Sequence, residues 1–416
     1  MAMRMTHRWS QRWPRGWQAA WLPVALLVVF GLGNGVRADD LVRSNPPLQS
    51  ATTALLESEE TGYSVISRDV SMALQTAPFK KEPAAGLGKV LRGVLKFGGN
   101  ASNSIPFLWQ KDAGKLFLDL NRNQDLTDDP AGIFSAGAQR QANYLVCTGV
   151  RLSFNTPSGM SRILADLTFW DFGRQPMCFA AVRSYWQGKV TLQGRDWQAG
   201  LVQNLAENPG SFENGQLLLR PWEERDRQFG ADSGSPDAFP FSPNLFVDGH
   251  AYALGLISGS QNGEARPSLQ FTERATALGE LRITGQFIQR LALASGPYLV
   301  VLDRPAPIVK VPLGGYGQPK IRLAQGGVEA FCPGSFSRAD NWIAVNDKTP
   351  VTLAAGGPLN NTVTANRQGR DLRLDYKLLG AGGQAYSLVR HGPAVQPEFA
   401  VYKGDKKIAS GKFEFG

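Results

Sequence analysis

Short apolar or alternating runs, separated by Gly, Pro, Asn and Asp, dominate the chain from about Lys89 onward. Such runs are typical of β-strands, because successive side chains of a strand point to opposite faces of the sheet. Clear examples are KLFLDL, YLVCTGVRLSF, ILADLTFWDF and GKVTLQG. The segment LGELRITGQFIQRLALASG, from Leu278, is ambiguous, but its alternation and Gly285 favour strands. We therefore predict a mainly β chain of antiparallel hairpins and β-sandwich-like domains, with little helix.

The composition fits a folded chain with many turns. Of 416 residues, 43% are hydrophobic and only 19% are charged, which excludes global disorder and allows two or three domains. The 46 glycines and 26 prolines supply turn residues without the three-residue period of collagen.

The N-terminus has the pattern of a secretory signal peptide. A basic stretch precedes the apolar run 19–33, and Ala38 is a small residue suited to cleavage before Asp39. The run is shorter than a spanning helix, although an uncleaved anchor remains the alternative. We expect an exported protein of the periplasm, cell surface or extracellular space, with no membrane span after cleavage. The basic residues before the run are Arg4, Arg8, Arg12 and Arg15.

Most of the positive charge belongs to this segment. Residues 1–38 contain five arginines and no acid, so 39 of the 44 basic residues remain against 35 acidic ones. The formal net charge falls from +9 to +4, which removes the main support for a nucleic-acid partner.

The pattern also suggests a division into segments. Ser50 is a potential N-cap, so a short helix is expected over 51–59. The predicted segments are 1–38 (signal peptide), 39–84 (N-terminal arm with the short helix), 85–225 (β domain with an Asp/Asn-rich loop), 226–325 (second β region after a long loop) and 326–416 (C-terminal β-sandwich).

Two stretches share residues at identical offsets, from Val190 to Val202 and from Leu245 to Ile257. Each is predicted to be a hairpin, turning at Gln193-Gly194 and at Asp248-Gly249, because Gly tolerates positive φ. The pattern fits two similar lobes, but any Gly-turned hairpin with an aromatic residue in its return strand would also produce it.

The stretch LVVLDRPAPIVKVPLGGYGQPKIRL, residues 299–323, resembles the strand–turn–strand pattern of prealbumin-like or carboxypeptidase-regulatory-like β-sandwich domains. The resemblance covers about twenty-five residues and implies a small sandwich. Near the C-terminus, a final hairpin is predicted to turn at Lys403-Gly404-Asp405.

The sharpest chemical motif is D-L-N-R-N-Q-D-L-T-D-D, which begins at Asp119. Calcium takes six to eight oxygen ligands, and oxygen side chains at alternating loop positions meet that demand. The loop resembles those of EF-hand and dockerin proteins, but Gln124 replaces the usual Gly and Pro130 stands at the position of the bidentate carboxylate. A structural calcium is predicted. The candidate ligands are Asp119, Asn121, Asn123, Asp125, Asp128 and Asp129.

An Asx-rich turn that bonds its own backbone is the alternative to a metal site at this loop. The preceding KLFLDL is a strand, so a helix–loop–helix sensor is not implied. Several carboxylates in one short loop would repel one another without a cation, which favours the ion.

Histidine and cysteine are scarce. The chain past residue 38 has His250 and His391, and no CxxC or HxxxH pair, so structural zinc is not expected. The cysteines either form one disulfide bridge, for which Cys147 and Cys178 are the candidates, or remain buried free thiols. A Cys332/His391 nucleophile pair has no specific support. The cysteines are Cys147, Cys178 and Cys332.

Binding or structural function is favoured over catalysis, because no G-x-S-x-G elbow or nucleotide loop is present. The partner would be a polysaccharide or a cell-envelope component. The alternative is a secreted polysaccharide hydrolase that uses Glu223 or Glu224 with Asp226 in the long loop 223–244. A carbohydrate-stacking platform is a further possibility against the ordinary burial of large rings in a core. Its candidate rings are Trp170, Trp186, Trp197, Trp222, Trp342 and Tyr185.

Overall fold

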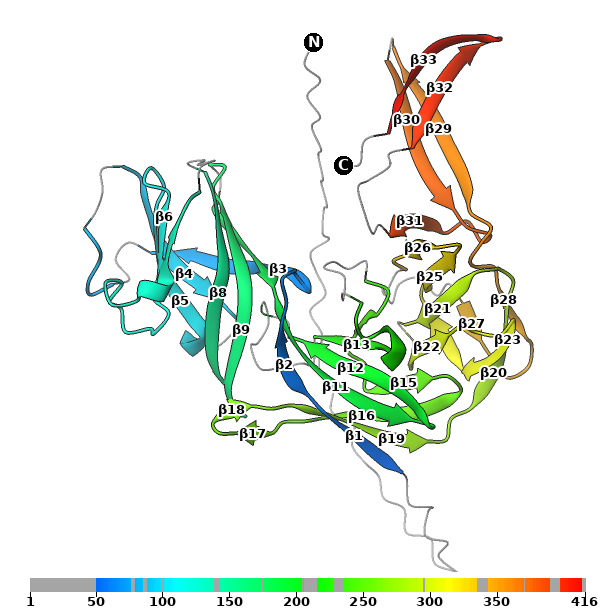
Figure 1. The fold of residues 1–416 in the computed structure, drawn as a ribbon, viewed down its shortest axis with the longest axis horizontal. Helices are drawn as coiled ribbons and strands as arrows, with labels where there is room; N and C mark the ends of the chain where they lie inside the picture. Colours follow the sequence, from blue (N-terminus) through cyan, green and yellow to red (C-terminus); the bar gives the residue numbers. More distant parts are fainter. Residues whose placement is uncertain are drawn as a thin grey trace, which may run out of the picture. The chain divides into compact units, whose positions relative to one another are not determined.

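The computed structural model describes residues 50–413 with internal gaps (Figure 1). The gaps are 76–78, 85–87, 99–100, 138–142, 157, 174, 204, 206–214, 228–234, 295, 335–342, 370 and 390–396. The expected signal peptide, His391 and Trp342 lie outside the described residues. Strands make up 64% of those residues and α-helix is absent from them, so the predicted fold class is confirmed. No helix in the described part is long and apolar enough to cross a membrane.

The largest sheet has eleven strands and joins segments that are far apart in the sequence. All of its pairings are antiparallel except that of β15 with β22, which is parallel. In spatial order its strands are β1 (Ala51–Leu55), β19 (Ser268–Arg274), β16 (His250–Ile257), β15 (Asn244–Val247), β22 (Leu299–Asp303), β21 (Ile288–Leu293), β25 (Lys320–Gln325), β26 (Val328–Cys332), β31 (Ala385–Val389), β30 (Asp371–Leu379) and β29 (Asn360–Gln368).

A ten-stranded sheet carries the Asp/Asn-rich loop between two of its strands, β6 and β7. Its strands along the path are β17 (Ser260–Gln261), β18 (Glu264–Ala265), β9 (Gly159–Trp170), β10 (Met177–Val182), β3 (Ile66–Leu74), β4 (Val90–Lys96), β5 (Ser104–Gln110), β6 (Lys115–Leu118) and β7 (Ile133–Ser135), and β8 (Tyr144–Thr156) pairs with β9. The inward side chains of β3 to β10 form one continuous apolar core.

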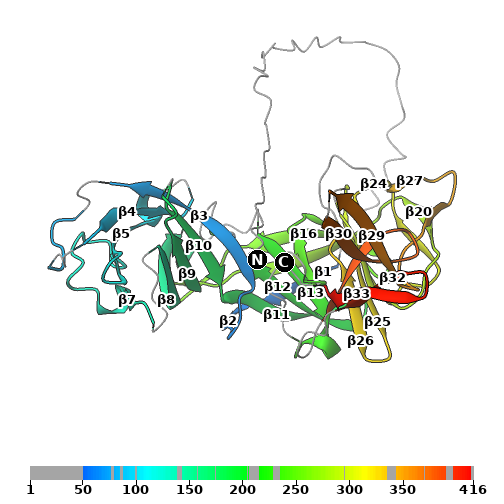
Figure 2. The ribbon, with the colours of Figure 1, turned by 90° about the horizontal axis from the view of Figure 1, so that it is seen from above.

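The third sheet has five strands and packs on the eleven-stranded sheet (Figure 2). Inward residues of both, such as Trp197, Leu219, Leu269 and Val301, share one core. This is the face-to-face packing of a sandwich. In order the strands are β14 (Ala238–Pro240), β13 (Gln216–Pro221), β12 (Arg195–Val202), β11 (Ser184–Leu192) and β2 (Glu57–Glu60).

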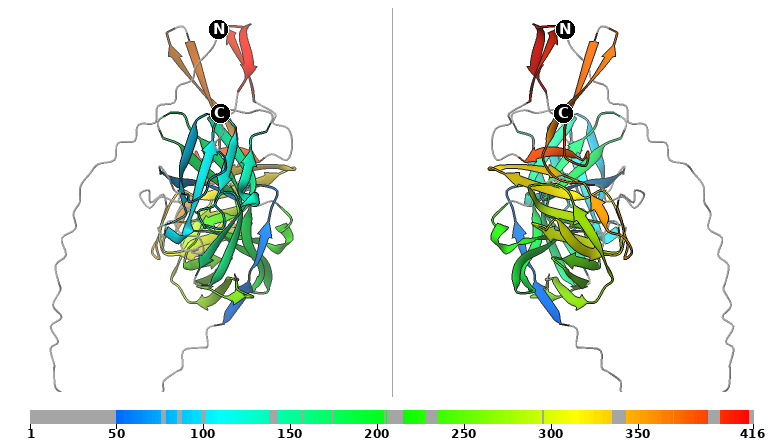
Figure 3. Two further views of the ribbon diagram at one scale, coloured as in Figure 1. Left: turned by 90° about the vertical axis from the view of Figure 1, so that its left-hand side faces the viewer. Right: turned by 90° about the vertical axis from the view of Figure 1, so that its right-hand side faces the viewer.

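Small sheets and short 3₁₀ turns complete the described chain. The small sheets are β23 (Ile308–Pro312), β20 (Leu278–Ile283) and β28 (Val351–Leu353); β24 (Gly314–Tyr316) and β27 (Ile343–Val345); and β32 (Glu398–Lys403) and β33 (Lys406–Lys412). The 3₁₀ turns are η1 (Ala101–Asn103), η2 (Pro130–Gly132) and η3 (Trp222–Glu224). The hairpin β32–β33 lies beside the hairpin β29–β30 (Figure 3). The ring centroids of Phe413, which follows β33, and Tyr376 on β30 are 5.2 Å apart.

The helix expected over 51–59 is wrong, because these residues form β1 and β2. Ser50, the expected N-cap, instead lies opposite β19: its carbonyl accepts the N–H of Glu273 at 3.1 Å and its hydroxyl lies 3.4 Å from the Glu273 carboxylate. Ala54 is buried in the core shared by the two sheets. Tertiary strand pairing therefore overrides the local capping signal.

The two predicted Gly-turned hairpins are confirmed as β11–β12 and β15–β16. Both turns have positive φ at both central residues: 48° and 77° at Gln193 and Gly194, 44° and 97° at Asp248 and Gly249. This is the type I′ geometry that matches strand twist. The segment from Leu278 forms β20 and β21, as predicted. The last hairpin turns at Gly404 and Asp405, as expected.

The domain boundaries remain a prediction, although strands from different predicted segments pair within one sheet. β1, from the expected arm, pairs with β19 of the expected second β region. The hairpin β25–β26 turns at Gly326 and Gly327, at the boundary expected between 325 and 326.

Candidate functional site

The Asp/Asn-rich loop connects β6 to β7 and is organised around one buried carboxylate. Asp119 follows β6 directly and is fully buried. Its two oxygens accept the backbone N–H groups of Asn123 at 3.1 Å and Gln124 at 2.9 Å. This folds the chain tightly around the side chain. Gln124 has a φ of 70°, so it adopts the left-handed conformation that a Gly takes in the loops it resembles.

Side chains later in the loop bond the backbone two residues on. The amide oxygen of Asn121 accepts the N–H of Asn123 at 3.0 Å, and the amide oxygen of Asn123 accepts that of Asp125 at 2.7 Å. The carboxylate of Asp125 accepts the N–H of Thr127 at 2.8 Å. These are Asx turns, the local bonding that is the alternative to a metal site at this loop.

The remaining carboxylates lie close to the same loop. Asp128 accepts the amide groups of Asn121 at 3.2 Å and Asn123 at 2.6 Å. Asp129 has one buried oxygen, Oδ2, without a hydrogen-bond partner among the described residues. Burial, together with the charges of Asp119 and Asp128, raises the pKa of Asp129, although the backbone N–H groups of Asn121 and Leu120 act to lower it. The six predicted ligands therefore lie on one loop. Three of them, Asp119, Asp128 and Asp129, are carboxylates that repel one another.

A cation of the protein partly offsets this charge. Lys81 lies 3.3 Å from Asp125, but its side chain is 64% exposed. Within the described chain, no three or more His, Cys, Asp or Glu side chains form a metal cluster by themselves. Calcium also takes amide and carbonyl oxygens, which Asn121 and Asn123 could supply. The donor set is thus of the right chemical type, and calcium stays a prediction.

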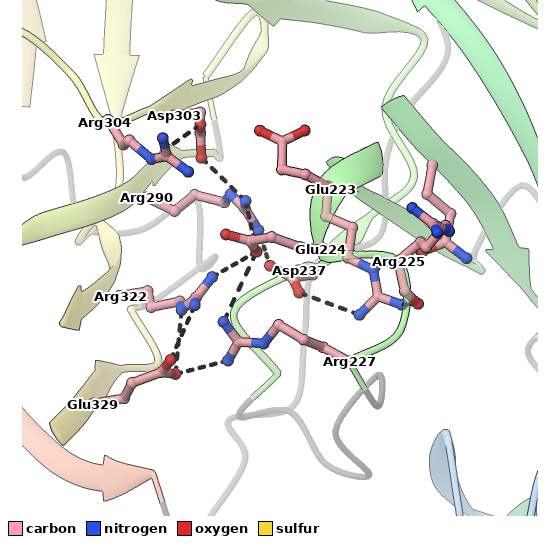
Figure 4. Close-up of polar contacts among 12 residues, drawn as sticks. Glu223, Glu224, Arg225, Arg227, Asp237, Arg290, Asp303, Arg304, Arg322 and Glu329 are labelled. Atoms are coloured by element: carbon pink, nitrogen blue, oxygen red, sulfur yellow. Dashed lines mark hydrogen bonds and ion pairs between the residues drawn. The ribbon is translucent and has the colours of Figure 1, made fainter. Parts of the chain in front are cut away.

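The carboxylates expected for hydrolysis do not form a pair of acid and base groups, because each of them has a different environment. Glu223 pairs with Arg195 at 2.9 Å; burial acts to raise its pKa, but its own backbone N–H and Arg195 lower it overall. Glu224 pairs with Arg322 at 2.7 Å and Arg290 at 3.2 Å (Figure 4). Asp226 points to solvent with 87% of its side chain exposed.

These contacts belong to a buried charge network that sequence reasoning missed. Arg290 binds Asp237, Glu224 and Asp303, and Arg322 also binds Glu329 at 3.1 Å (Figure 4). Arg290 is 1% exposed, and its carboxylate partners raise its pKa despite the opposing effect of burial. The sequence signal for this network is an arginine followed by apolar residues within a strand, as in IQRLAL and KIRLAQ.

The aromatic residues do not form one platform. Trp186 and Trp197 are buried in the core between two sheets. Trp170 stacks on Tyr144, with ring centroids 6.2 Å apart, at one end of the ten-stranded sheet. Trp222, in η3, and Tyr185, in β11, line a different feature, a groove.

This groove lies over one face of β2, β11 and β12 and has a volume of about 670 Å³. Glu59 is directly opposite Tyr185, and Lys189 is opposite Gln198, so these side chains share a face. The residues that define the groove are Glu59, Tyr63, Tyr185, Gln187, Gln198 and Trp222.

Histidine and cysteine contribute no catalytic arrangement among the described residues. His250 contacts the Glu273 carboxylate through Nδ1 at 3.0 Å. All three cysteines are buried and free, and burial raises the pKa of Cys147 to about 12. Cys147 and Cys178 lie on β8 and β10, which flank β9, so two strand spacings of roughly 4.8 Å separate their backbones. That separation exceeds the reach of a disulfide.

Comparisons with known proteins add no relative. No protein-family model, no curated protein and no solved structure matches the chain. The resemblances of residues 119–129 and 299–323 therefore rest on their own residues.

Proposed function

We propose that the protein is an exported, extracytoplasmic β-rich protein that binds a polysaccharide or cell-envelope component, and that calcium stabilises its Asp119–Asp129 loop. The observation that carries the calcium proposal is the buried Oδ2 of Asp129, which lacks a hydrogen-bond partner among the described residues and faces the charges of Asp119 and Asp128. A buried charged oxygen without a partner is unfavourable, and a bound cation would satisfy it.

The residues that would hold the ion are the predicted set of four aspartates and two asparagines. Calcium would supply positive charge and oxygen coordination at the centre of the loop. The backbone bonds to Asp119 preorganise the loop, because they fix the chain around its carboxylate without any ion.

A stabilised loop would hold neighbouring strands together. Arg122, within the loop, donates to the backbone carbonyl of Ser153 on β8 at 2.6 Å. A backbone β-bridge between Asp125 and Lys81 also joins the loop to the segment before β4. An ion that binds only the folded state adds to its stability by mass action, so the thermal midpoint should rise with calcium concentration.

The test is a calorimetric titration of the chelator-treated protein with calcium, accompanied by thermal unfolding. Saturable binding that is lost in Asp119→Ala and Asp129→Asn supports the proposal. Asp371→Ala, on the exposed hairpin β29–β30, is the matched control and should bind as the unchanged protein does. Absence of heat and of any shift in thermal midpoint would reduce the loop to an Asx-rich turn.

Hydrolysis through the long loop is the competing function. A general acid needs a raised pKa near the working pH, whereas the pKa of Glu223 is lowered and Glu224 is held by arginines. These contacts favour a structural role for both carboxylates. Release of reducing sugar from a polysaccharide, abolished in Glu223→Gln, would refute the binding function.

A further inference from the structure

The groove defined by Glu59, Tyr63, Tyr185, Gln187, Gln198 and Trp222 is made mainly of polar side chains. We propose that it binds an uncharged oligosaccharide. The proposal rests on the proposed binding function and names the site and the ligand class. Its volume of about 670 Å³ is within the range of roughly 300–1,000 Å³ that is usual for ligand sites.

A chain of hydrogen bonds orders the polar groups beneath the groove. The Tyr185 hydroxyl donates to Gln187 Oε1 at 3.2 Å, and Gln198 donates to the same oxygen. The buried Arg220 donates to Gln198 Oε1 at 2.6 Å. The amide nitrogen of Gln187 has no partner in the part of the chain that the structure describes. Two N–H donors therefore face the groove in a fixed orientation, ready for a ligand hydroxyl or carbonyl.

Glu59 supplies the acceptor. Its neighbours on β2 are engaged, Glu57 with Arg266 at 2.8 Å and Glu60 with Arg151. The Glu59 side chain makes no ion pair or hydrogen bond with any described residue. A carboxylate accepts hydrogen bonds at two oxygens, so it can bind two neighbouring hydroxyl groups of one sugar ring.

Trp222 supplies an aromatic surface that is held in place. Its ring lies 5.2 Å from Lys189 Nζ and 5.3 Å from the guanidinium of Arg225. Of the next two residues, Glu223 pairs with Arg195, and Glu224 is held by Arg322 (Figure 4). A pyranose ring has an apolar C–H face and a rim of hydroxyl groups. An indole beside amide and carboxylate groups matches both parts.

The charges of the groove select against other ligands. Four carboxylates line it, on Glu57, Glu59, Glu60 and Asp226, against the three cations of Lys189, Arg225 and Arg227. A uronate polymer would add negative charge to this surface. A peptide adding to β2, the edge of its sheet, would meet carboxylates at three of four strand positions, the arrangement that protects edges from pairing. An uncharged saccharide avoids both penalties.

The test uses the purified exported chain with cellotetraose and N-acetylglucosamine tetramer, titrated by calorimetry and followed by tryptophan fluorescence. Binding of either probe should weaken at least tenfold in Trp222→Ala, Gln187→Ala and Glu59→Gln. Trp170→Ala, a partly exposed tryptophan outside the groove, is the matched control and should stay within twofold. Glu59→Gln changes a surface side chain only, so its loss of binding cannot reflect unfolding.

Each other result has a distinct meaning. Saccharide binding with equal affinity in all variants overturns the groove as the site but leaves the proposed binding function standing. No binding of either probe overturns the saccharide site, while the calcium titration on the same sample tests the proposed calcium loop separately. Binding of an oligolysine peptide that Glu59→Gln abolishes, without saccharide binding, also overturns it. Cleavage of a bound probe supports the saccharide site but refutes the non-catalytic function.

Discussion

Replacing Arg290 with Met should destabilise the protein through one orphaned carboxylate. Arg290 is 1% exposed and binds Asp237, Glu224 at 3.2 Å and Asp303 at 3.1 Å. Met keeps much of the side-chain volume but removes the charge. Loss of one partner from a buried ion pair costs about 3–5 kcal/mol, because the remaining charge stays buried without compensation.

The neighbouring cations determine where in this range the loss should lie. Asp303 keeps Arg195 at 2.7 Å, and Glu224 keeps Arg322 at 2.7 Å. Asp237 keeps only Arg220 at 3.9 Å within the described ion pairs. One carboxylate rather than three loses its close partner, so the free energy of unfolding should fall by about 3 kcal/mol. In urea denaturation this is a midpoint shift of about 1 M, at a slope of about 3 kcal/mol/M.

Arg282→Met is the control, because Arg282 pairs with Glu280 at 2.7 Å on the surface. Such pairs contribute about 1 kcal/mol or less. Adding Asp237→Asn to Arg290→Met should cost less than the sum of the two single changes, since the orphaned charge is removed. A loss no larger than that of Arg282→Met, or strict additivity of the pair, would refute the reasoning.

Three further predictions concern export, pH and thiols. N-terminal sequencing of the exported protein should begin at Asp39; a start at Met1 would contradict cleavage. Burial lowers the pKa of Lys320 to about 8, against 10.5 for an exposed lysine, so between these pH values the unfolded state binds more protons. The contribution of Lys320 to the free energy of unfolding should therefore rise by up to about 3 kcal/mol from pH 8 to pH 10.5. The difference between the unchanged protein and Lys320→Met should show this rise in urea titrations, and a flat difference would exclude it. A thiol reagent should label no cysteine of the folded protein and three after unfolding, counted by mass; labelling of the native protein would contradict the burial of Cys147, Cys178 and Cys332.

The fold class was predictable because its signals are local. Alternation within one strand, and the turn pairs Gln193-Gly194 and Asp248-Gly249, depend on residues that are adjacent in the chain. The Asp119–Asp129 loop was predictable for the same reason, since all its oxygen groups lie within eleven residues. Gln124 shows the limit of the pattern, because a non-glycine residue takes the left-handed conformation there.

The features that were missed depend on contacts distant in sequence. The residues after Ser50 have a helix start signal, but their pairing with β19 decides their structure. The groove combines Glu59, Gln187 and Trp222, which no sequence spacing connects. The partners of Arg290 come from β22, η3 and the residue before β14. Tertiary proximity of this kind cannot be read from a single sequence.

The pairing of β1 with β19 also determines when this fold can close. Ala51 of β1 lies opposite Thr272, so β1 can pair only after more than two hundred further residues have been synthesised. Ser58 of β2 lies opposite Trp186, so β2 can pair only after more than a hundred. Chains with such high contact order fold slowly, because large loops must close before the pairing is gained. A chain that we propose is exported would thus remain unfolded while a translocation channel threads it, and would complete its sheets after it emerges.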